Sequence, residues 1–355
     1  MADSLKLGII GCGDIAYAHG KAARENRDDV RFVACCDVRP DAANDWASEH
    51  DVERTYADCD AMLNAEDLDA VVIATWPNLH REQVGRCLAA GIENILCEKA
   101  LTLTGREALE IYEAVNAAGA FLMEGFMYRH HPATRTLADL VASGNIGRVD
   151  AVRACFSNCE PETASADDPT RNWRQRKECA GGIPYDYACY CVNACQAFAG
   201  GIPRRVICSG GLSEKYDIVD RMHALVEYDD GCVGFIESSK HQAFTQELQV
   251  SGSDAILDLP IAWTVPGPIT VTRRHAREWA DVVTDEIAIP AANSYALQMA
   301  NFARVVRGEA APRVPLAESV VNTFTIEAMV NSLTERREVE IEIPDNLIAA
   351  IKEAN

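Results

Sequence analysis

The residues whose types and spacing could bind a ligand begin with two glycines and an aspartate. In the segment GIIGCGDIA, Gly11 allows a tight turn, Gly13 lets the backbone approach a pyrophosphate, and Ala16 lets the next helix pack closely. Asp37 stands 21 residues beyond Ala16, where a carboxylate can accept the ribose hydroxyl groups of an adenosine. The alternative is an ordinary turn with a capping aspartate. Because the turn and the acid lie in register with a strand, a helix and a second strand, the pattern favours a dinucleotide site.

The choice between NAD and NADP depends on two residues that follow the second predicted strand or end it. Asp37 disfavours a 2′-phosphate and so favours NAD, whereas Arg39 could bind that phosphate and keeps NADP possible. We therefore expect NAD in preference to NADP. The other residues expected at the cofactor follow strands of the same region, and they are Asp14, Ile15, Thr75, Trp76, Asn78, His80, Glu98 and Lys99.

Strands and helices of the first third must position these residues. Four apolar runs predict strands, LKLGIIG, VRFVACCDV, LDAVVIAT and NILCEKA, and helices are predicted from about residue 14, over 40–50, over 81–91 and over 105–119. Runs that are apolar on both faces and alternate with helices are typical of a parallel sheet buried on both sides. We expect a doubly wound α/β fold, a Rossmann NAD(P)-binding domain, over residues 1–125.

The remaining residues change periodicity. Alternating runs predict strands over 149–158, 204–212, 222–230, 232–240 and 247–259, and Asp230-Gly231 between two of them predicts a hairpin turn. Helices are predicted over 132–143, 185–199, 293–307 and 316–335. We expect an α+β domain with a largely antiparallel open sheet over residues 126–355. The Pro-rich acidic stretch EPETASADDP predicts a solvated loop.

The composition excludes some classes of partner. The 355 residues carry 33 Lys and Arg against 54 Asp and Glu, a formal net charge of −21, and 48% of them are apolar. Such a charge repels nucleic acid and anionic lipid, so neither partner is expected. No apolar run approaches the roughly 20 residues that cross a bilayer, and MADSLKLGII lacks the features of an export signal. We expect a soluble, cytoplasmic protein.

Fourteen cysteines lie mostly within apolar runs. They are interpreted as small core residues that stay reduced in a cytoplasm. Cys189, Cys191 and Cys195 are close together, but no CxxC pair or partner cluster with zinc-site spacing accompanies them. We therefore expect no metal site.

Four separated segments, in the same order, carry a resemblance to a known family. They are ATWPNLH (74–80), LCEKALT (96–102), MEGFMYRHHPATRTLADLVASGNIGRV (123–149) and NWRQRKECAGGIPYDYACYCVN (172–193). Together with the fingerprint they resemble the glucose–fructose oxidoreductase, inositol dehydrogenase and rhizopine catabolism (Gfo/Idh/MocA) family. The resemblance covers nearly the whole chain and is specific for the family rather than for a substrate.

The resemblance implies catalytic roles for three residues. The family's catalytic lysine falls on Lys99, its acid on Asp186 and its proton-transfer residue on Tyr190. The residues agree with these roles, because Lys99 ends a parallel strand and Asp186 and Tyr190 share one face of the helix predicted over 185–199. A tyrosine beside an ammonium can take the hydroxyl proton when a hydride leaves. Without the resemblance, a salt bridge is as reasonable as a catalytic role for Lys99, and simple packing is favoured over catalysis for Tyr190.

Three departures from the family pattern sharpen or limit what the resemblance implies. Ala100 follows Lys99 where the family usually has proline, and Trp76 is inserted in the T-P-N-x-x-H-like turn. Tyr190 replaces the histidine of inositol dehydrogenase, which is similar to the branch with glucose–fructose oxidoreductase and the dimeric dihydrodiol and xylose dehydrogenases. That branch implies an NAD(P)-dependent oxidoreductase acting on a hydroxyl-bearing carbon of a sugar or cyclic polyol.

Other residues and other functions stay open at this point. Arg129, Trp173 and Arg174 could line the substrate cleft, but each could equally pack or form an interdomain salt bridge. One alternative function is a dinucleotide-binding sensor or repressor of the same fold without turnover. Another is a sugar–sugar oxidoreductase whose cofactor stays tightly bound. The resemblance also implies that residues 126–355 bind substrate and form oligomers. In the resembled family the open sheets pair between subunits, which implies a homodimer or homotetramer.

Overall fold

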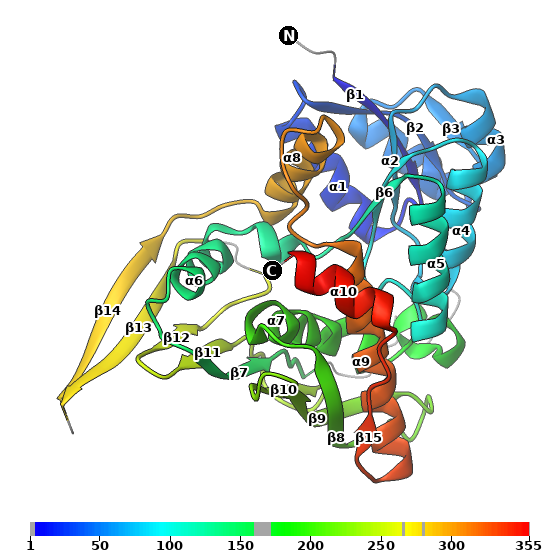
Figure 1. The fold of residues 1–355 in the computed structure, drawn as a ribbon. Coiled ribbons are helices and arrows are strands. Elements are labelled where there is room, and N and C mark those ends of the chain that lie inside the picture. Colours follow the sequence, from blue (N-terminus) through cyan, green and yellow to red (C-terminus); the bar gives the residue numbers. More distant parts are fainter. Residues whose placement is uncertain (1–3, 160–171, 265–266, 279–280, 355) are drawn as a thin grey trace. The chain divides into compact units, whose positions relative to one another are not determined.

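The computed structural model describes residues 4–159, 172–264, 267–278 and 281–354, and they form two compact units (Figure 1). The segment EPETASADDP, predicted as a solvated loop, lies outside these residues. The first unit also includes the segment 293–316, which lies beyond the predicted boundary between residues 125 and 126. The predicted division of function between a cofactor domain and a substrate domain stays a prediction. The first unit comprises Met1–Thr102, Arg106–His130 and Asn293–Leu316, and the second comprises Leu103–Gly105, His131–Ala292 and Ala317–Asn355.

The first unit is built on a six-stranded sheet whose described neighbours are all parallel. Its order is β3-β2-β1-β4-β5-β6, so the direction of strand addition reverses between β1 and β4. Ligands bind at the carboxyl ends of the strands at such a reversal. The predicted doubly wound α/β fold is confirmed. The strands are β1 (Leu5–Ile10), β2 (Val30–Cys36), β3 (Arg54–Tyr56), β4 (Ala70–Ile73), β5 (Asn94–Cys97) and β6 (Phe121–Glu124).

Helices cover both faces of this sheet, with α1 and α8 on one side and α4 and α5 on the other (Figure 1). Proline occupies the first turn of α2 and α4, where its missing N–H costs nothing. Helix α8 comes late in the sequence but packs on α1, and Asn26 Nδ2 donates to the carbonyl of Ala296 over 2.9 Å. The helices are α1 (Asp14–Glu25), α2 (Pro40–His50), α3 (Cys59–Ala65), α4 (Pro77–Ala89), α5 (Gly105–Ala117), η1 (Met127–His130) and α8 (Ser294–Val306).

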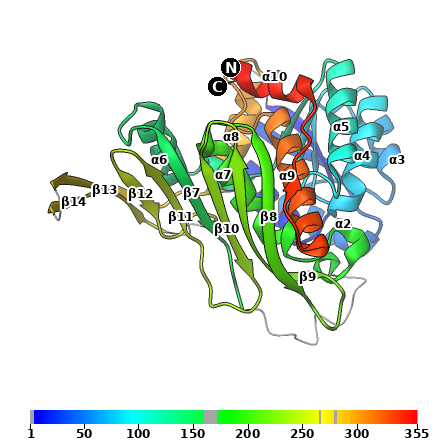
Figure 2. The same ribbon diagram turned by 60° about the horizontal axis from the view of Figure 1, so that its bottom comes forward.

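The second unit is built on a nine-stranded sheet of order β14-β13-β12-β11-β7-β10-β9-β8-β15 (Figure 2). The described neighbours are antiparallel except β7 and β10, which run parallel. The predicted largely antiparallel sheet is therefore confirmed. Its strands are β7 (Val149–Cys155), β8 (Pro203–Leu212), β9 (Val219–Tyr228), β10 (Val233–Ser239), β11 (Leu248–Gly252), β12 (Ile256–Leu259), β13 (Ile269–Glu278), β14 (Asp281–Ile289) and β15 (Val339–Glu340).

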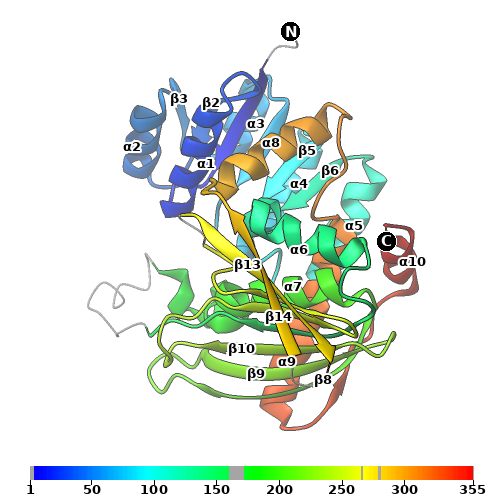
Figure 3. The same ribbon diagram turned by 90° about the vertical axis from the view of Figure 1, so that its left-hand side faces the viewer.

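Turns in this sheet show what the sequence pattern could and could not predict. The hairpin predicted at Asp230-Gly231 joins β9 to β10, and Gly231 has the positive φ of +89° that this turn requires. The long ribbon of β13 and β14 was not predicted (Figure 3). Most side chains of β14 are exposed, so the apolar alternation that indicates a half-buried strand is absent there.

The helices of the second unit include α7 and α9, which lie on the same side of the sheet (Figures 2 and 3). The helix predicted over 185–199 begins instead with a π-helical turn, η5 (Pro184–Ala188), and continues as α7 (Cys189–Ala199). Nearly every residue of α7 is buried, so no amphipathic period was there to reveal the change. The others are α6 (Pro132–Ala142), η3 (Trp173–Gln175), η4 (Lys177–Cys179), α9 (Leu316–Glu335) and α10 (Asp345–Ala354).

None of the helices in the described residues combines the length and the apolar character needed to cross a bilayer.

Candidate active site

The turn between β1 and α1 depends on glycine at its first position. Gly11 has a φ of +94°, and its N–H donates to the carbonyl of Cys36 over 2.8 Å. A Cβ atom at Gly11 would lie 2.7 Å from the carbonyl oxygen of Ala74, closer than real Cβ atoms approach. The backbone of β1 therefore turns tightly against β4 at the point where the strand order reverses.

Gly13 leaves space rather than avoiding a clash. A Cβ atom built on Gly13 meets no atom of the described chain within 4 Å, and Gly13 is the N-cap of α1 without a side-chain cap. The first N–H groups of a helix carry a partial positive charge and accept an anion when no side chain caps them. The pyrophosphate of a dinucleotide fits this space and this charge.

Asp37 fixes the same turn through both of its carboxylate oxygens. Oδ2 accepts from the N–H of Cys12, and Oδ1 accepts from the N–H of Arg39, each over 2.9 Å. The Arg39 guanidinium is half exposed, with Nε 3.5 Å from Asp37 Oδ1. Asp37 is not the cap of the following helix, because the N-cap of α2 is Arg39 and no side chain caps it. Each oxygen keeps a second lone pair, so the carboxylate can also accept ribose hydroxyl groups.

The turn after β4 surrounds a buried imidazole. His80 has no exposed surface; Nδ1 lies 3.1 Å from the carbonyls of both Ala100 and Leu101, and Nε2 lies 3.2 Å from that of Thr75. Burial lowers the pKa of His80. The ring ties the β4–α4 turn to the segment after Lys99, and its predicted contact with the cofactor stays a prediction. Trp76 is the N-cap of α4, and the Asn78 side chain is exposed in its first turn.

The end of β5 carries Glu98 and Lys99. Glu98 is 5% exposed, and its Oε1 lies 2.8 Å from Nε2 of His19, a fully buried residue of α1. Glu98 Oε2 accepts from the backbone N–H of Lys99 over 3.3 Å. The peptide bond between Lys99 and Ala100 is cis. Sequence reasoning missed His19, because nothing in the local pattern distinguishes it from a packed core histidine.

In the second unit, Asp186 is held by an ion pair. Asp186 lies in the π-helical turn η5 with 2% of its surface exposed, and Arg174 Nε donates to its Oδ2 over 2.7 Å. The Arg174 guanidinium also lies 5.0 Å from the ring centre of Trp173. The predicted substrate residues Trp173 and Arg174 and the predicted acid Asp186 are therefore brought together. A buried carboxylate needs such a partner to stay charged.

Tyr190, one turn further along, lies in an aromatic cluster. Its ring centre is 5.5 Å from that of Phe156 and 6.0 Å from that of Trp263, and Phe156 also stacks on Tyr187 at 4.4 Å. Trp263 is fixed in turn, since its Nε1 donates to the carbonyl of Cys155 over 2.9 Å. The cluster leaves Tyr190 6% exposed and fixes its ring plane. Phe156 and Trp263 were not predicted, because they are distant from Tyr190 in sequence.

Two remaining predictions concern Arg129 and metal binding. Arg129 is a residue of the first unit, where its Nη2 donates to the carbonyl of Arg313 over 3.0 Å. Its role toward a substrate stays a prediction. Among the residues that the structure describes, no cluster of three or more His, Cys, Asp or Glu side chains could hold a metal ion.

Comparisons with known proteins place both units in one family. Residues 5–126 match the oxidoreductase family with an NAD-binding Rossmann fold, and residues 134–258 match the GFO/IDH/MocA C-terminal domain. A D-xylose 1-dehydrogenase (NADP(+)) of Haloferax volcanii is 33% identical over 348 residues, which cover 95% of this chain and 100% of the relative. A trans-1,2-dihydrobenzene-1,2-diol dehydrogenase of Bos taurus is 26% identical over 77% of this chain and 79% of its own length.

Solved structures agree with these matches. A 3-ketoreductase from Actinomadura kijaniata, in complex with NADP and TDP-benzene, has a TM-score of 0.81 at 25% identity over 93% of this chain and 98% of its own. A levoglucosan dehydrogenase in complex with NADH and L-sorbose has a TM-score of 0.85 at 20% identity over 97% of this chain and 100% of its own, which shows a common fold.

Proposed function

Since this chain belongs to the Gfo/Idh/MocA family of oxidoreductases and is an NAD(P)-dependent dehydrogenase or reductase, we propose that it transfers a hydride between nicotinamide and a hydroxyl-bearing carbon of a small sugar or cyclic polyol. The observation that carries the proposal is the Asp186–Arg174 ion pair followed by Tyr190 on one continuous helical segment. A charged acid and an oriented phenol are what proton exchange with a hydroxyl substrate needs. The xylose dehydrogenase relative, aligned over the whole chain, supports a sugar.

Residues of the first unit hold the cofactor in this proposal. The Gly11–Gly13 turn and the N-terminus of α1 bind the pyrophosphate, and Asp37 accepts the ribose hydroxyl groups. The nicotinamide ring, when bound, supplies the hydride donor or acceptor. Lys99 lies two residues beyond the end of β5, at the carboxyl edge of the sheet, where that ring binds in folds of this kind.

The proton is exchanged by Tyr190. The Lys99 ammonium lowers the pKa of the Tyr190 hydroxyl and hydrogen-bonds the substrate oxygen, and Asp186 orients substrate and lysine. Four residues after Lys99, the carbonyl of Leu103 accepts from the Tyr185 hydroxyl over 3.0 Å, and Tyr185 directly precedes Asp186.

Turnover on a panel of sugars and polyols, followed by absorbance of reduced nicotinamide, tests the proposal. Lys99→Ala should lower kcat by about 10³-fold, within the range for loss of a group that assists proton transfer. Its affinity for the dinucleotide should stay within about threefold of wild type, because the phosphates bind at α1. The matched control is Lys21→Ala, which removes an exposed lysine of α1. Near-normal turnover of Lys99→Ala would refute the role of Lys99.

The same panel separates the rival functions. Dinucleotide binding with no turnover on any sugar or polyol would establish a sensor of this fold in place of an enzyme. Dinucleotide retained through purification, with turnover only when two sugars are supplied together, would establish a sugar–sugar oxidoreductase.

We also propose NAD as the preferred cofactor. Asp37 presents a carboxylate where a 2′-phosphate would lie, and the Arg39 guanidinium is already beside that carboxylate. Initial rates with NAD and NADP at matched concentration decide this. A large preference for NADP, the cofactor in the name of the Haloferax volcanii relative, would overturn it.

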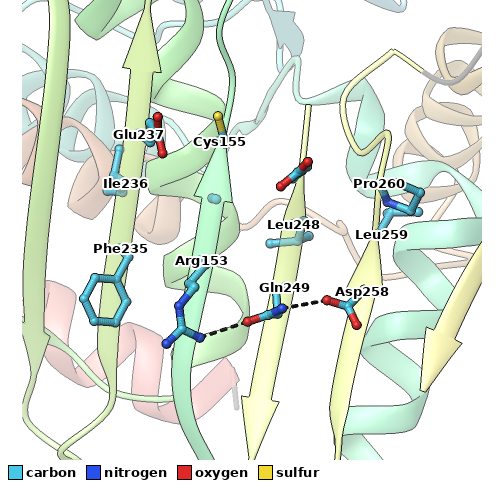
Figure 4. Close-up of a pocket in the computed structure, with 12 residues that line it drawn as sticks. Arg153, Cys155, Phe235, Ile236, Glu237, Leu248, Gln249, Asp258, Leu259 and Pro260 are labelled. Carbon is cyan, nitrogen blue, oxygen red and sulfur yellow. Dashed lines mark hydrogen bonds between the residues drawn. The ribbon is translucent and has the colours of Figure 1, made fainter. Parts of the chain in front are cut away.

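The open face of the second sheet supports a proposed homodimer or homotetramer. Phe235, Arg153, Gln249 and Asp258 follow one another across this face, and Arg153 and Asp258 both hydrogen-bond Gln249 (Figure 4). They line a cavity of about 520 Å³, and Phe235 is 38% exposed. A second copy carries the same mixture of apolar, basic and acidic groups, so it can pair opposite charges despite the net charge of −21. Light scattering should give two or four times the chain mass, and a monomeric mass would contradict the proposal.

A further inference from the structure

The buried pair of His19 and Glu98 lies outside the roles described so far. We propose that His19 is a positioning residue, which fixes Lys99 by holding the Glu98 carboxylate. The inference rests on the proposed catalytic role of Lys99. It adds a residue of α1, the helix whose N-terminus receives the pyrophosphate, to the machinery that places the lysine.

Glu98 is held at both carboxylate oxygens. Oε1 accepts from Nε2 of His19 over 2.8 Å, and Oε2 accepts from the Lys99 backbone N–H over 3.3 Å. Gly125 leaves room for the carboxylate, because a Cβ atom there would lie 3.0 Å from Glu98 Oε1 and 3.2 Å from Glu98 Cα. The Glu98 side chain is therefore confined on one side by backbone and on the other by the imidazole.

His19 is itself fixed. It is fully buried, and its ring meets the ring of Tyr295 edge-on, with centres 5.8 Å apart and planes at 82°. Among the described residues Nδ1 of His19 has no hydrogen-bond partner, so within this part of the chain the ring makes its polar contact with Glu98 through Nε2. The tautomer with a proton on Nε2 donates directly to the carboxylate.

The energetics make this contact consequential for Lys99. A buried carboxylate is costly unless donors compensate it, and removing one donor leaves the full desolvation cost on Glu98. Without His19 the carboxylate would turn toward water or take up a proton. Either change weakens the acceptor of the Lys99 N–H, and a displacement of about 1 Å at a reacting group can cost on the order of 10²-fold in rate.

The arrangement also connects the phosphate-binding turn with Lys99. One helix receives the phosphates at its first turn and, five residues later, holds the acid that fixes the lysine. The separation between the bound phosphates and Lys99 is thereby set through α1 rather than through the β5 backbone alone.

The experiment compares His19→Ala with His19→Gln. His19→Ala should lower kcat by about 30-fold, with the KM for sugar and the Kd for NADH within about threefold of wild type. His19→Gln should recover most of the loss, because its amide N–H can donate to Glu98. Met62→Ala is the control, since Met62 is a fully buried core residue of the same unit on α3. It should reduce thermal stability without reducing kcat.

A double-mutant cycle completes the test and separates the two proposals. If His19 acts through Lys99, adding His19→Ala to Lys99→Ala should change the residual rate by less than about threefold. Normal kcat in a folded His19→Ala protein would overturn the inference alone. Should His19→Ala fail to fold, a His19→Gln protein without recovered kcat would overturn it as well. Near-normal turnover of Lys99→Ala would instead overturn the proposed function, independently of His19.

Discussion

The ligand edge of the first unit and the Asp186–Tyr190 segment of the second are positioned in different ways. In the first unit the backbone sets the site: a positive φ at Gly11, an open space at Gly13, and strand ends of fixed register. In the second unit side chains set the site, through the Arg174 ion pair and the aromatic cluster around Tyr190. Added side-chain atoms should therefore impair the first site, which is built by the backbone. Removed side-chain atoms should impair the second site, which is built by side chains.

Removing a single oxygen tests the second region most severely. Tyr190→Phe keeps the ring that packs on Phe156 and Trp263 but removes the proposed proton-transfer group, so kcat should fall by about 10³-fold. The melting temperature should change little, because the packing is kept. Tyr228→Phe is the matched control, a buried tyrosine of β9 whose pKa is raised by burial. Equal kcat losses in the two variants would show that Tyr190 has no special role.

Adding atoms tests the first region. Gly13→Val places its side chain in the open space above α1, so the Kd for NADH should rise by about 30-fold or more, which is about 2 kcal/mol. The φ of −80° at Gly13 suits any residue, so stability should be kept. Gly85→Ala on α4 is the control, with equally open space around its Cβ. Gly11→Ala should instead lower the melting temperature, because its Cβ atom would lie too close to the carbonyl oxygen of Ala74. Unchanged NADH affinity in Gly13→Val would place the dinucleotide elsewhere.

Weakening the ion pair tests whether Asp186 depends on its partner. Arg174→Met keeps much of the side-chain volume but removes the donor at 2.7 Å, so kcat/KM should fall by about 30-fold through misplacement of Asp186. Arg205→Met serves for comparison, because it breaks an exposed pair with Glu227 on β8 and β9. A kcat/KM within about twofold of wild type in Arg174→Met would show that Asp186 keeps its position without Arg174.

Thiol reactivity is the smallest of the expected effects. It compares how readily a reagent in solution reaches cysteines of the two regions. Cys12 lies in the turn of the first unit and Cys191 flanks Tyr190, and both are buried. Burial raises the pKa of Cys191, and it also raises that of the half-buried Cys155 to about 11. With an aromatic disulfide reagent at pH 8, the exposed Cys159 should react first. The rate at Cys155 should rise roughly tenfold per pH unit below its pKa, because only the thiolate reacts.

Cys159→Ser should remove the fast phase of that titration. A fast phase that persists in this variant would mean that a thiol other than Cys159, either the half-buried Cys59 or Cys155 or one of the buried thiols, is open to solvent.

The parts of the molecule that could be predicted from sequence are those where local geometry demands one residue type. Gly11 at a positive φ, Asp37 after β2 and the hairpin at Gly231 belong to this group. Strands buried on both faces give continuous apolar runs, so the parallel sheet was predicted as well.

The remaining features depend on contacts that sequence spacing does not encode. Arg174 meets Asp186 through two turns of irregular backbone, and His19 meets Glu98 across 79 positions. The π-helical turn has no signature in the sequence, because the helix α7 that continues it is buried on nearly all sides and shows no amphipathic period. The exposed strand β14 lacks alternation altogether. Burial and long-range pairing thus carry the information that residue types alone do not.

Helix α8 makes the chain interleaved rather than modular. The polypeptide leaves the first unit, builds most of the second, returns as α8 to pack on α1 and to stack Phe302 on Phe121, and then leaves again for α9. A gene fragment that stops at residue 125 would expose the surface that fully buried Phe302 covers. An exchange of the first unit with that of another nucleotide-binding protein would therefore have to include α8 together with the first 130 residues.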